Sequence, residues 1–287
     1  MIKQLMLWFA RSILVGVGYI IALMIVGAVL AALGVRFASA NQGAAMLPWL
    51  FVGGIVIGLV LGPIASQLFV KRTRHVIVWT CVIFFNIVSV VIEGAFFAPA
   101  QIGGNLPALI AQQFILAVTA ACLVTWLFAP TANTIIILPL RAWYDWLWRL
   151  VVSAASYLVF YFIFGAINYA LVTKPYYDAH AGGLAIPSTE IVLIAETVRG
   201  VMIVLSILPF LLTVSKPTRV RAVWAGSILF VVGGIVPLLY QVSSLPILLL
   251  VASGIEIFFQ NFSTGMVTAL LLGRMPNNAA ATSGLGR

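Results

Sequence analysis

Hydrophobic positions along the chain gather in long blocks of about 20 residues, and short polar intervals separate them. Eight such blocks stand at roughly 12–35, 48–70, 76–98, 108–129, 150–172, 191–213, 222–241 and 246–273. About 20 apolar residues in a helix cross the roughly 30 Å of hydrocarbon in a bilayer. A β-barrel would instead show alternating segments of about ten residues. The pattern therefore predicts an all-α, polytopic transmembrane helix bundle of about eight helices, forming a single domain over residues 1–273.

Composition supports a membrane protein and narrows its chemistry. Of 287 residues, 63% are hydrophobic and 7% are charged, whereas soluble domains carry roughly 25% charged residues. Mean hydropathy is +1.19. The two cysteines, Cys81 and Cys122, lie inside apolar blocks, so we interpret them as packing residues rather than as a disulfide framework or a metal site.

The basic residues fall in alternate intervals between the blocks. The richer intervals and termini hold Lys3, Arg11, Lys71, Arg72, Arg74, Arg141, Arg149, Lys216, Arg219, Arg221, Arg274 and Arg287, whereas the other intervals hold only Arg36 and Lys174. Lysine and arginine are retained on the cytoplasmic side of membranes. An even number of crossings puts every basic cluster there, so we predict a multi-pass protein of the plasma (inner) membrane with both termini cytoplasmic. The same distribution argues against nucleic-acid binding despite a net charge of +9. Residues 274–287 are predicted to form a disordered cytoplasmic tail.

Two stretches of the chain resemble each other. Residues 11–19 align with residues 149–157 without a gap, ending at Tyr19 and Tyr157, and the segment 71–74 resembles 216–219. We interpret this as an internal repeat of 1–130 and 139–273. Four crossings in each half would make the halves parallel, related by an axis along the membrane normal. The repeat also favours an uncleaved first helix over a signal peptide, since its apolar run of about 24 residues exceeds the 7–15 of a signal sequence.

Four ionisable residues lie inside the apolar blocks: Glu93, Glu196, Arg199 and Glu256. Each costs about 3 kcal/mol at the centre of a membrane helix, so such residues face the bundle interior and find partners. Counted from the predicted outer ends of the helices, all four fall in the outer half of the membrane. Asn86 and Ser89 share a helical face with Glu93, and Gln260, Asn261 and Thr264 lie on or close to the face of Glu256.

We interpret six of these residues as a candidate ligand- or ion-binding site: Glu93, Glu196, Arg199, Glu256, Gln260 and Asn261. One arginine cannot neutralise three acids, so protons or a bound cation must supply the remaining positive charge. A structural interpretation stays open beside this one. Polar side chains also hold membrane helices together, and Glu196 with Arg199, three residues apart, can form a self-neutralised pair.

Enzyme motifs with HExxH, GxSxG or P-loop spacing do not occur in the sequence. His75 and His180 are predicted on opposite sides of the bilayer, so we predict neither a cofactor nor a metal. The favoured function is a transporter- or channel-like protein for a small solute, ion or lipid component. One alternative is a non-catalytic subunit of a larger membrane complex. Another is a membrane enzyme acting on a lipid-linked substrate, with Glu93 or Glu256 as acid or base. Expected partners are the lipid bilayer, a small solute or proton, and other membrane subunits.

Overall fold

The computed structural model describes residues 2–35, 40–98, 105–132 and 141–273. Within these ranges the chain is helical without β-strands, and eight helical spans are long and apolar enough to cross a membrane. This confirms the predicted helical membrane class and the number of spans. The predicted tail, 274–287, lies outside the described residues.

The four spans of the first half are regular α-helices. They are α1 (Ile2–Ala32), α2 (Ala40–Ala65), α3 (Arg72–Phe97) and α5 (Leu106–Phe128). Helix α5 begins where the side chain of Asn105 accepts a hydrogen bond from the backbone N–H of Ala108, a standard way to satisfy the first free donors of a helix. Helix α1 begins about ten residues before the predicted apolar block, because the segment that carries Lys3 and Arg11 continues the spanning helix.

Three of the four spans in the second half contain a π-helical segment. The fifth span joins α6 (Trp143–Asn168), η1 (Tyr169–Thr173) and α7 (Lys174–Asp178), and the sixth is α8 (Thr189–Thr213) after the short turn η2 (Ala181–Gly183). The seventh span joins α9 (Thr218–Phe230), η3 (Val231–Ile235) and α10 (Val236–Tyr240), and the eighth joins α11 (Ile247–Ile257), η4 (Phe258–Phe262) and α12 (Ser263–Leu272). Segments of π-helix are rare and gather at functional sites.

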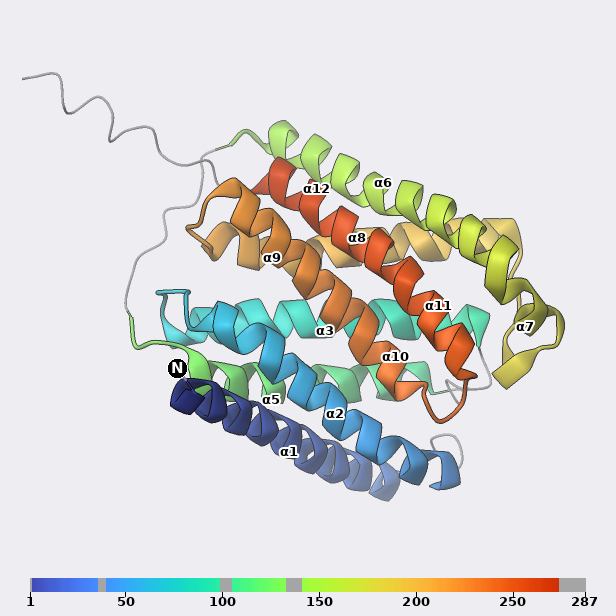
Figure 1. The fold of residues 1–287 in the computed structure, drawn as a ribbon, viewed down its shortest axis with the longest axis horizontal. Helices are drawn as coiled ribbons and strands as arrows, with labels where there is room; N and C mark the ends of the chain where they lie inside the picture. The colour runs from blue at the N-terminus through green and yellow to red at the C-terminus, as the bar shows by residue number, and fades with distance from the viewer. Residues whose placement is uncertain (1, 36–39, 99–104, 133–140, 274–287) are drawn as a thin grey trace, which may run out of the picture.

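The spans lie side by side between two ends of the bundle (Figure 1). We call one the basic end, because it carries the α2–α3 and α8–α9 connections with Lys71, Arg72, Arg74, Lys216 and Arg219. At this end Arg149 and Arg141 donate to the carbonyls of Leu271 (2.7 Å) and Gly273 (3.1 Å). These cations meet the last free carbonyls of α12, where the helix dipole favours positive charge. The opposite end, with η2 and the connection between α10 and α11, is called the η2 end.

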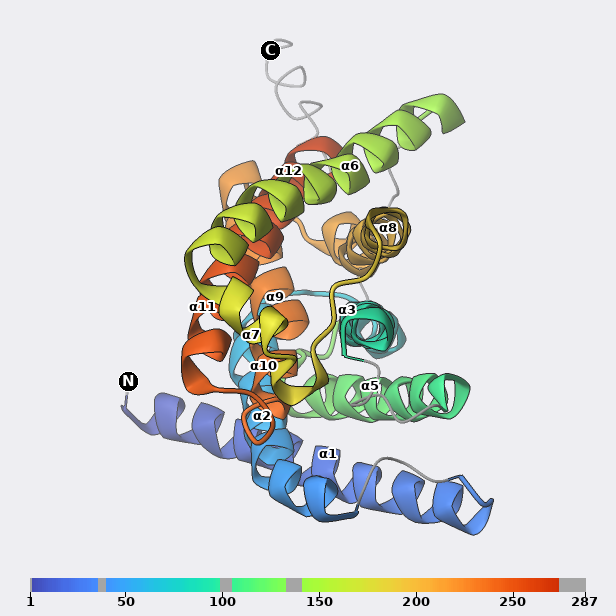
Figure 2. The ribbon, with the colours of Figure 1, turned by 90° about the vertical axis from the view of Figure 1, so that its right-hand side faces the viewer.

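Helix contacts follow a similar order in the two halves. In the first half α1 packs on α2 and α5, and α3 packs on α5; in the second, α6 packs on α8 and α12, and α9 packs on α12. Between the halves, α3 contacts α8 while α10 contacts α2. Viewed along the helices, α3 and α8 lie between α1 and α6 (Figure 2). This order of neighbours agrees with the predicted correspondence of spans, and the internal repeat itself stays a prediction.

Glycines allow two of these helix pairs to approach closely. A Cβ added to Gly54 of α2 would lie 2.8 Å from the Cα of Gly16 in α1, and one added to Gly265 of α12 would lie 2.6 Å from the backbone nitrogen of Gly226 in α9. Small residues at such contacts let backbones pack where no hydrophobic effect drives helices together. The buried core takes side chains from every span, including Tyr19, Trp79, Tyr157 and Phe210.

Candidate functional site

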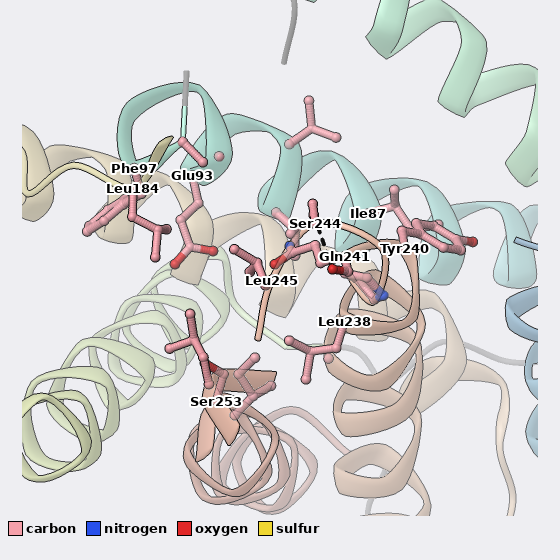
Figure 3. Close-up of a pocket in the computed structure, with 18 of the residues that line it drawn as sticks. Ile87, Glu93, Phe97, Leu184, Leu238, Tyr240, Gln241, Ser244, Leu245 and Ser253 are labelled. Atoms are coloured by element: carbon pink, nitrogen blue, oxygen red, sulfur yellow. Dashed lines mark hydrogen bonds between the residues drawn. The ribbon is translucent and has the colours of Figure 1, made fainter. Parts of the chain in front are cut away.

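A cavity of about 870 Å³ opens at the η2 end between α3, the α9–α10 span and α11. Its mouth includes the exposed Ser243 and Ser244 of the connection between α10 and α11. Apolar side chains form much of the wall, and Figure 3 shows the carboxylate of Glu93 reaching from α3 toward the helix that carries Ser253. The polar lining includes Glu93, Gln113, Arg199, Gln241, Ser244 and Ser253. A volume of this size is typical of a small-molecule site.

An ion pair between α3 and α8 forms part of the wall. Arg199 Nη1 lies 2.5 Å from Glu93 Oε2 and 3.6 Å from Glu196 Oε2. The side chain of Arg199 is 3% exposed and that of Glu196 is 0% exposed, whereas that of Glu93 is 25% exposed. Glu196 and Arg199 are three residues apart on α8, so both point to the same helix face. The cluster is therefore buried at the back and open toward the cavity at Glu93.

Tyr157 of α6 closes the buried side of this cluster. Its hydroxyl donates a hydrogen bond to Glu196 Oε2 (2.9 Å), and the guanidinium carbon of Arg199 lies 5.6 Å from its ring centroid. Tyr157 itself is fully buried. Tyr157 aligns with Tyr19 in the predicted internal repeat, but it was not among the predicted site residues.

Glu256 lies in a separate polar contact between α6 and α11. Its carboxylate accepts hydrogen bonds from Asn168 Nδ2 (2.5 Å) and Gln260 Nε2 (2.7 Å). Neither Glu256 nor Gln260 lines the cavity, and within the described ranges Glu256 forms no ion pair. Asn168 was not among the predicted site residues; as an isolated amide in an apolar helix, it carried a signal that could have been used.

Asn261 belongs to a third group, in the middle of the bundle. It donates through Nδ2 to the carbonyl of Leu229 (3.1 Å), and Asn86 donates to Ser206 Oγ (2.8 Å). A Cβ added to Gly233 would lie 2.5 Å from Asn86 Oδ1 and 3.2 Å from Asn261 Nδ2. Because Gly233 also lines the cavity, the two amides lie behind the cavity wall.

The predicted polar layer thus divides into three groups. Glu93, Glu196 and Arg199 are in direct contact, Glu256 and Gln260 form a hydrogen-bonded pair four residues apart on the eighth span, and Asn261 faces α9. All four ionisable residues lie nearer the η2 end: at 1.5 Å per residue, Glu93 is about 6 Å along its helix from Phe97, and Glu256 about 14 Å from Ile247.

The two histidines lie at opposite ends of the bundle. In the described part of the chain, no three histidine, cysteine, aspartate or glutamate side chains gather as a metal site would require. His75 lies near the basic end, where its Nε2 is 2.9 Å from the carbonyl of Leu68, whereas His180 lies beside η2. The cavity can instead offer a carboxylate, a guanidinium, amides and hydroxyls to a polar ligand.

A second buried tyrosine occupies the first half. The hydroxyl of Tyr240 donates to that of Tyr19 (3.1 Å). A Cβ added to Gly53 would lie 2.8 Å from Cε1 of Tyr240. The contact is therefore closely packed and carries no charge.

Comparison of the chain with protein-family models, with curated proteins and with solved structures gives no match. The site itself has to carry the functional inference.

Proposed function

We propose that the chain is a transporter- or channel-like membrane protein in which a small polar solute enters the cavity from the η2 end. One observation carries the proposal: the ion pair between Glu93 and Arg199 forms part of the wall of a cavity of about 870 Å³. Charge inside a membrane bundle is costly and marks solute or ion pathways. A cavity at that position gives the charge a ligand to meet.

The charge of the cluster indicates the kind of solute. Two carboxylates contact one guanidinium, and Glu93 is the acid with access to the cavity. A positively charged group on the solute would compete with Arg199 for Glu93. A negatively charged group on the same molecule would then bind the released guanidinium, because arginine pairs well with carboxylate and phosphate. A zwitterionic or cationic solute therefore fits better than an anion.

The interpretation as a structural subunit is the main rival. It requires a dry polar cluster in which every charge is paired between packed helices. The partial exposure of Glu93 to a cavity supports transport over this alternative. The lipid-linked enzyme has less support, since Glu256 is bound by two amides on the α6–α11 contact and does not line the cavity.

We also propose that the basic end faces the cytoplasm of the plasma (inner) membrane. Lysines and arginines of two connections lie together at that end, which is the charge bias that orients membrane proteins. The cavity would then open to the outside. A cysteine at Ser243, labelled by a membrane-impermeant reagent from outside intact cells, tests this orientation; labelling only after permeabilisation would contradict it.

Cysteine accessibility tests the pathway without knowledge of the solute. In a Cys81→Ala, Cys122→Ala background, Ser253→Cys should react quickly with a cationic, water-soluble thiol reagent added at the η2 end. Ser206→Cys, at a fully buried position behind the cavity wall, should react far more slowly with the same reagent. A structural subunit predicts that both cysteines stay unreactive from either side, and this result would contradict the proposal.

Flux through liposomes tests the charged residue directly. Liposomes that contain the purified protein should take up radiolabelled choline or glycine betaine faster than protein-free liposomes do. Their uptake of lactate should equal that of protein-free liposomes. Glu93→Gln should remove most of this flux. Glu190→Gln is the matched control, since it makes the same change at an exposed site on α8. Equal flux in wild type and Glu93→Gln would refute the role of Glu93.

A further inference from the structure

An apolar groove runs along the opposite side of the helix pair that borders the cavity. Its volume is about 580 Å³, and its lining includes Phe230, Ile235, Leu239, Val251, Ile255 and Phe259. Val251 is 53% exposed and Ile255 is 57% exposed. In spans of this length and hydropathy, such exposed aliphatic side chains face the hydrocarbon of the bilayer.

One side chain is common to the groove and the cavity. Leu238 of α10 lines both, and Figure 3 shows it near Ser253 of α11. A Cβ added to Gly254 would lie 3.6 Å from Cδ1 of Leu238, and one added to Gly234 would lie 2.5 Å from Cγ2 of Ile257. The partition between groove and cavity therefore includes two aliphatic side chains, Leu238 and Ile257, each beside a glycine of the other helix.

The backbone beside this partition is irregular. The π-helical segment η3 ends at Ile235, and Pro237 follows two residues later. Proline has no N–H to donate, and a π-helical turn departs from the regular hydrogen-bond ladder. Leu238 thus lies on a part of its helix that has fewer regular backbone hydrogen bonds, so this part can move more easily relative to α11.

We propose that the solute of the cavity is an amphiphile, with a zwitterionic head in the cavity and a hydrocarbon chain in the groove. This inference rests on the proposed function and names the class of its solute. The head would place its ammonium group at Glu93 and its anionic group at Arg199. The chain would pass between the α9–α10 span and α11 once Leu238 moves.

The groove gives the hydrocarbon chain of the solute a path and does not raise the affinity for the solute. Lipid is as apolar as the groove, so a chain that moves from one to the other gains little hydrophobic free energy. A hydrocarbon chain drawn past the polar groups of the cavity would instead lose the apolar surroundings that stabilise each of its methylene groups. A head that enters the cavity while its chain stays in the groove avoids that loss.

Photo-crosslinking tests the inference in vesicles of phosphatidylglycerol, whose head lacks an ammonium group. The probe is phosphatidylethanolamine with a photoreactive group in one chain, and diacylglycerol with the same chain is the control lipid. Mass spectrometry should find severalfold more crosslinks at Val251 and Ile255 with the probe than with the control. Equal labelling by both lipids would overturn the inference.

Variants separate the groove from the head site. Gly254→Leu should fill the groove and remove the excess crosslinks, and Leu248→Phe, an exposed position on the same helix outside the groove, should keep them. Glu93→Gln should reduce probe labelling to the level of diacylglycerol. If Gly254→Leu keeps the excess crosslinks while Glu93→Gln still abolishes flux of water-soluble solutes, the proposal of an amphiphilic solute is wrong and the proposed transport function is retained. If Glu93→Gln changes neither crosslinking nor flux, both proposals fail.

Discussion

Two buried tyrosines, one in each half of the bundle, lie in similar packing and very different electrostatics. Tyr157 contacts Gly200 of the next span, and Tyr19 contacts Gly54: a Cβ at either glycine would lie 3.1 Å from an atom of the tyrosine. Around Tyr157 the neighbouring groups are charged, with Glu196 as its hydrogen-bond acceptor. Around Tyr19 the acceptor and donor are two neutral hydroxyls.

The difference depends on the residue before each glycine. Arg199 precedes Gly200, whereas Gly53 precedes Gly54, and the ring of Tyr240 occupies the space beside Gly53. Helix α3 supplies Glu93 to Arg199, whereas α10 supplies Tyr240 to Tyr19. The same kind of helix contact can thus hold either a charged cluster or a neutral pair of hydroxyls. Packing alone does not require the charges, which supports a functional reason for them.

The largest effect should come from removal of the guanidinium. Arg199→Met leaves Glu93 and Glu196 without their cation, and loss of one partner of a buried ion pair costs about 3–5 kcal/mol. Unfolding in mixed micelles should show this loss, whereas Arg219→Met at an exposed position should change stability little. The triple variant Arg199→Met, Glu93→Gln, Glu196→Gln should recover most of the stability. If the triple variant does not recover stability, the charged side chains are required for helix packing around Tyr157, and the two tyrosine contacts are not alike in packing.

The paired glycines test whether the packing is truly alike. A Cβ at Gly54 would lie 2.8 Å from the Cα of Gly16, and one at Gly200 would lie 2.9 Å from the carbonyl oxygen of Ala154. Backbone atoms have little freedom to move, so each alanine substitution should destabilise by about 2 kcal/mol. Thermal unfolding of the two variants checks this. A large effect at one glycine alone would show that the two contacts differ in packing as well.

Hydroxyl removal should separate the two tyrosines. Tyr157→Phe takes a hydrogen bond from a carboxylate and should cost about 1.5–3 kcal/mol. Tyr19→Phe takes a hydrogen bond between neutral hydroxyls and should cost about 0.6 kcal/mol, the average for interhelical hydrogen bonds in a membrane protein. The same unfolding measurement serves for both, and equal costs would argue against a charged Glu196.

A small effect on stability, with no effect on the cavity, is expected at Glu256. Gln in place of Glu256 keeps one carbonyl oxygen, so one of the two amide donors from Asn168 and Gln260 loses its acceptor. Stability should fall by about 1 kcal/mol. Because Glu256 does not line the cavity, Ser253→Cys should react with the cationic reagent at an unchanged rate. A slower reaction would connect Glu256 to the site after all.

Hydrophobic blocks predicted the spans well, because each span needs about 20 apolar residues whatever it packs against. The rarity of charged residues also predicted the contact among Glu93, Glu196 and Arg199, since a buried arginine needs acids nearby. The separation of Asn261 from Glu256 was beyond such reasoning. Positions were counted on a regular helix, but η4 spans Phe258–Phe262, and a π-helical turn rotates the residues that follow it. Nothing in the residue pattern predicted that turn.

Tyr157 and Tyr240 show a second limit. Both are aromatic residues in apolar helices, where burial is the usual outcome. Which of them meets a carboxylate depends on the neighbouring helix, and the chain alone does not specify that neighbour. The cavity is likewise a property of how α3, α10 and α11 are arranged rather than of any one segment.

The position of Arg199 on the same helix as Glu196 has a consequence for biosynthesis. Spans are delivered to the membrane in chain order, so α3 arrives with Glu93 before α8 exists. By the insertion scale, an ionised side chain adds about 3 kcal/mol to the cost of entering the bilayer at a helix centre, and Glu93, four residues from the end of α3, adds a part of that cost. Helix α8 carries its own counter-charge three residues away, whereas α3 has to wait for one. The first half of the protein should therefore insert less efficiently when produced alone than when α8 follows it.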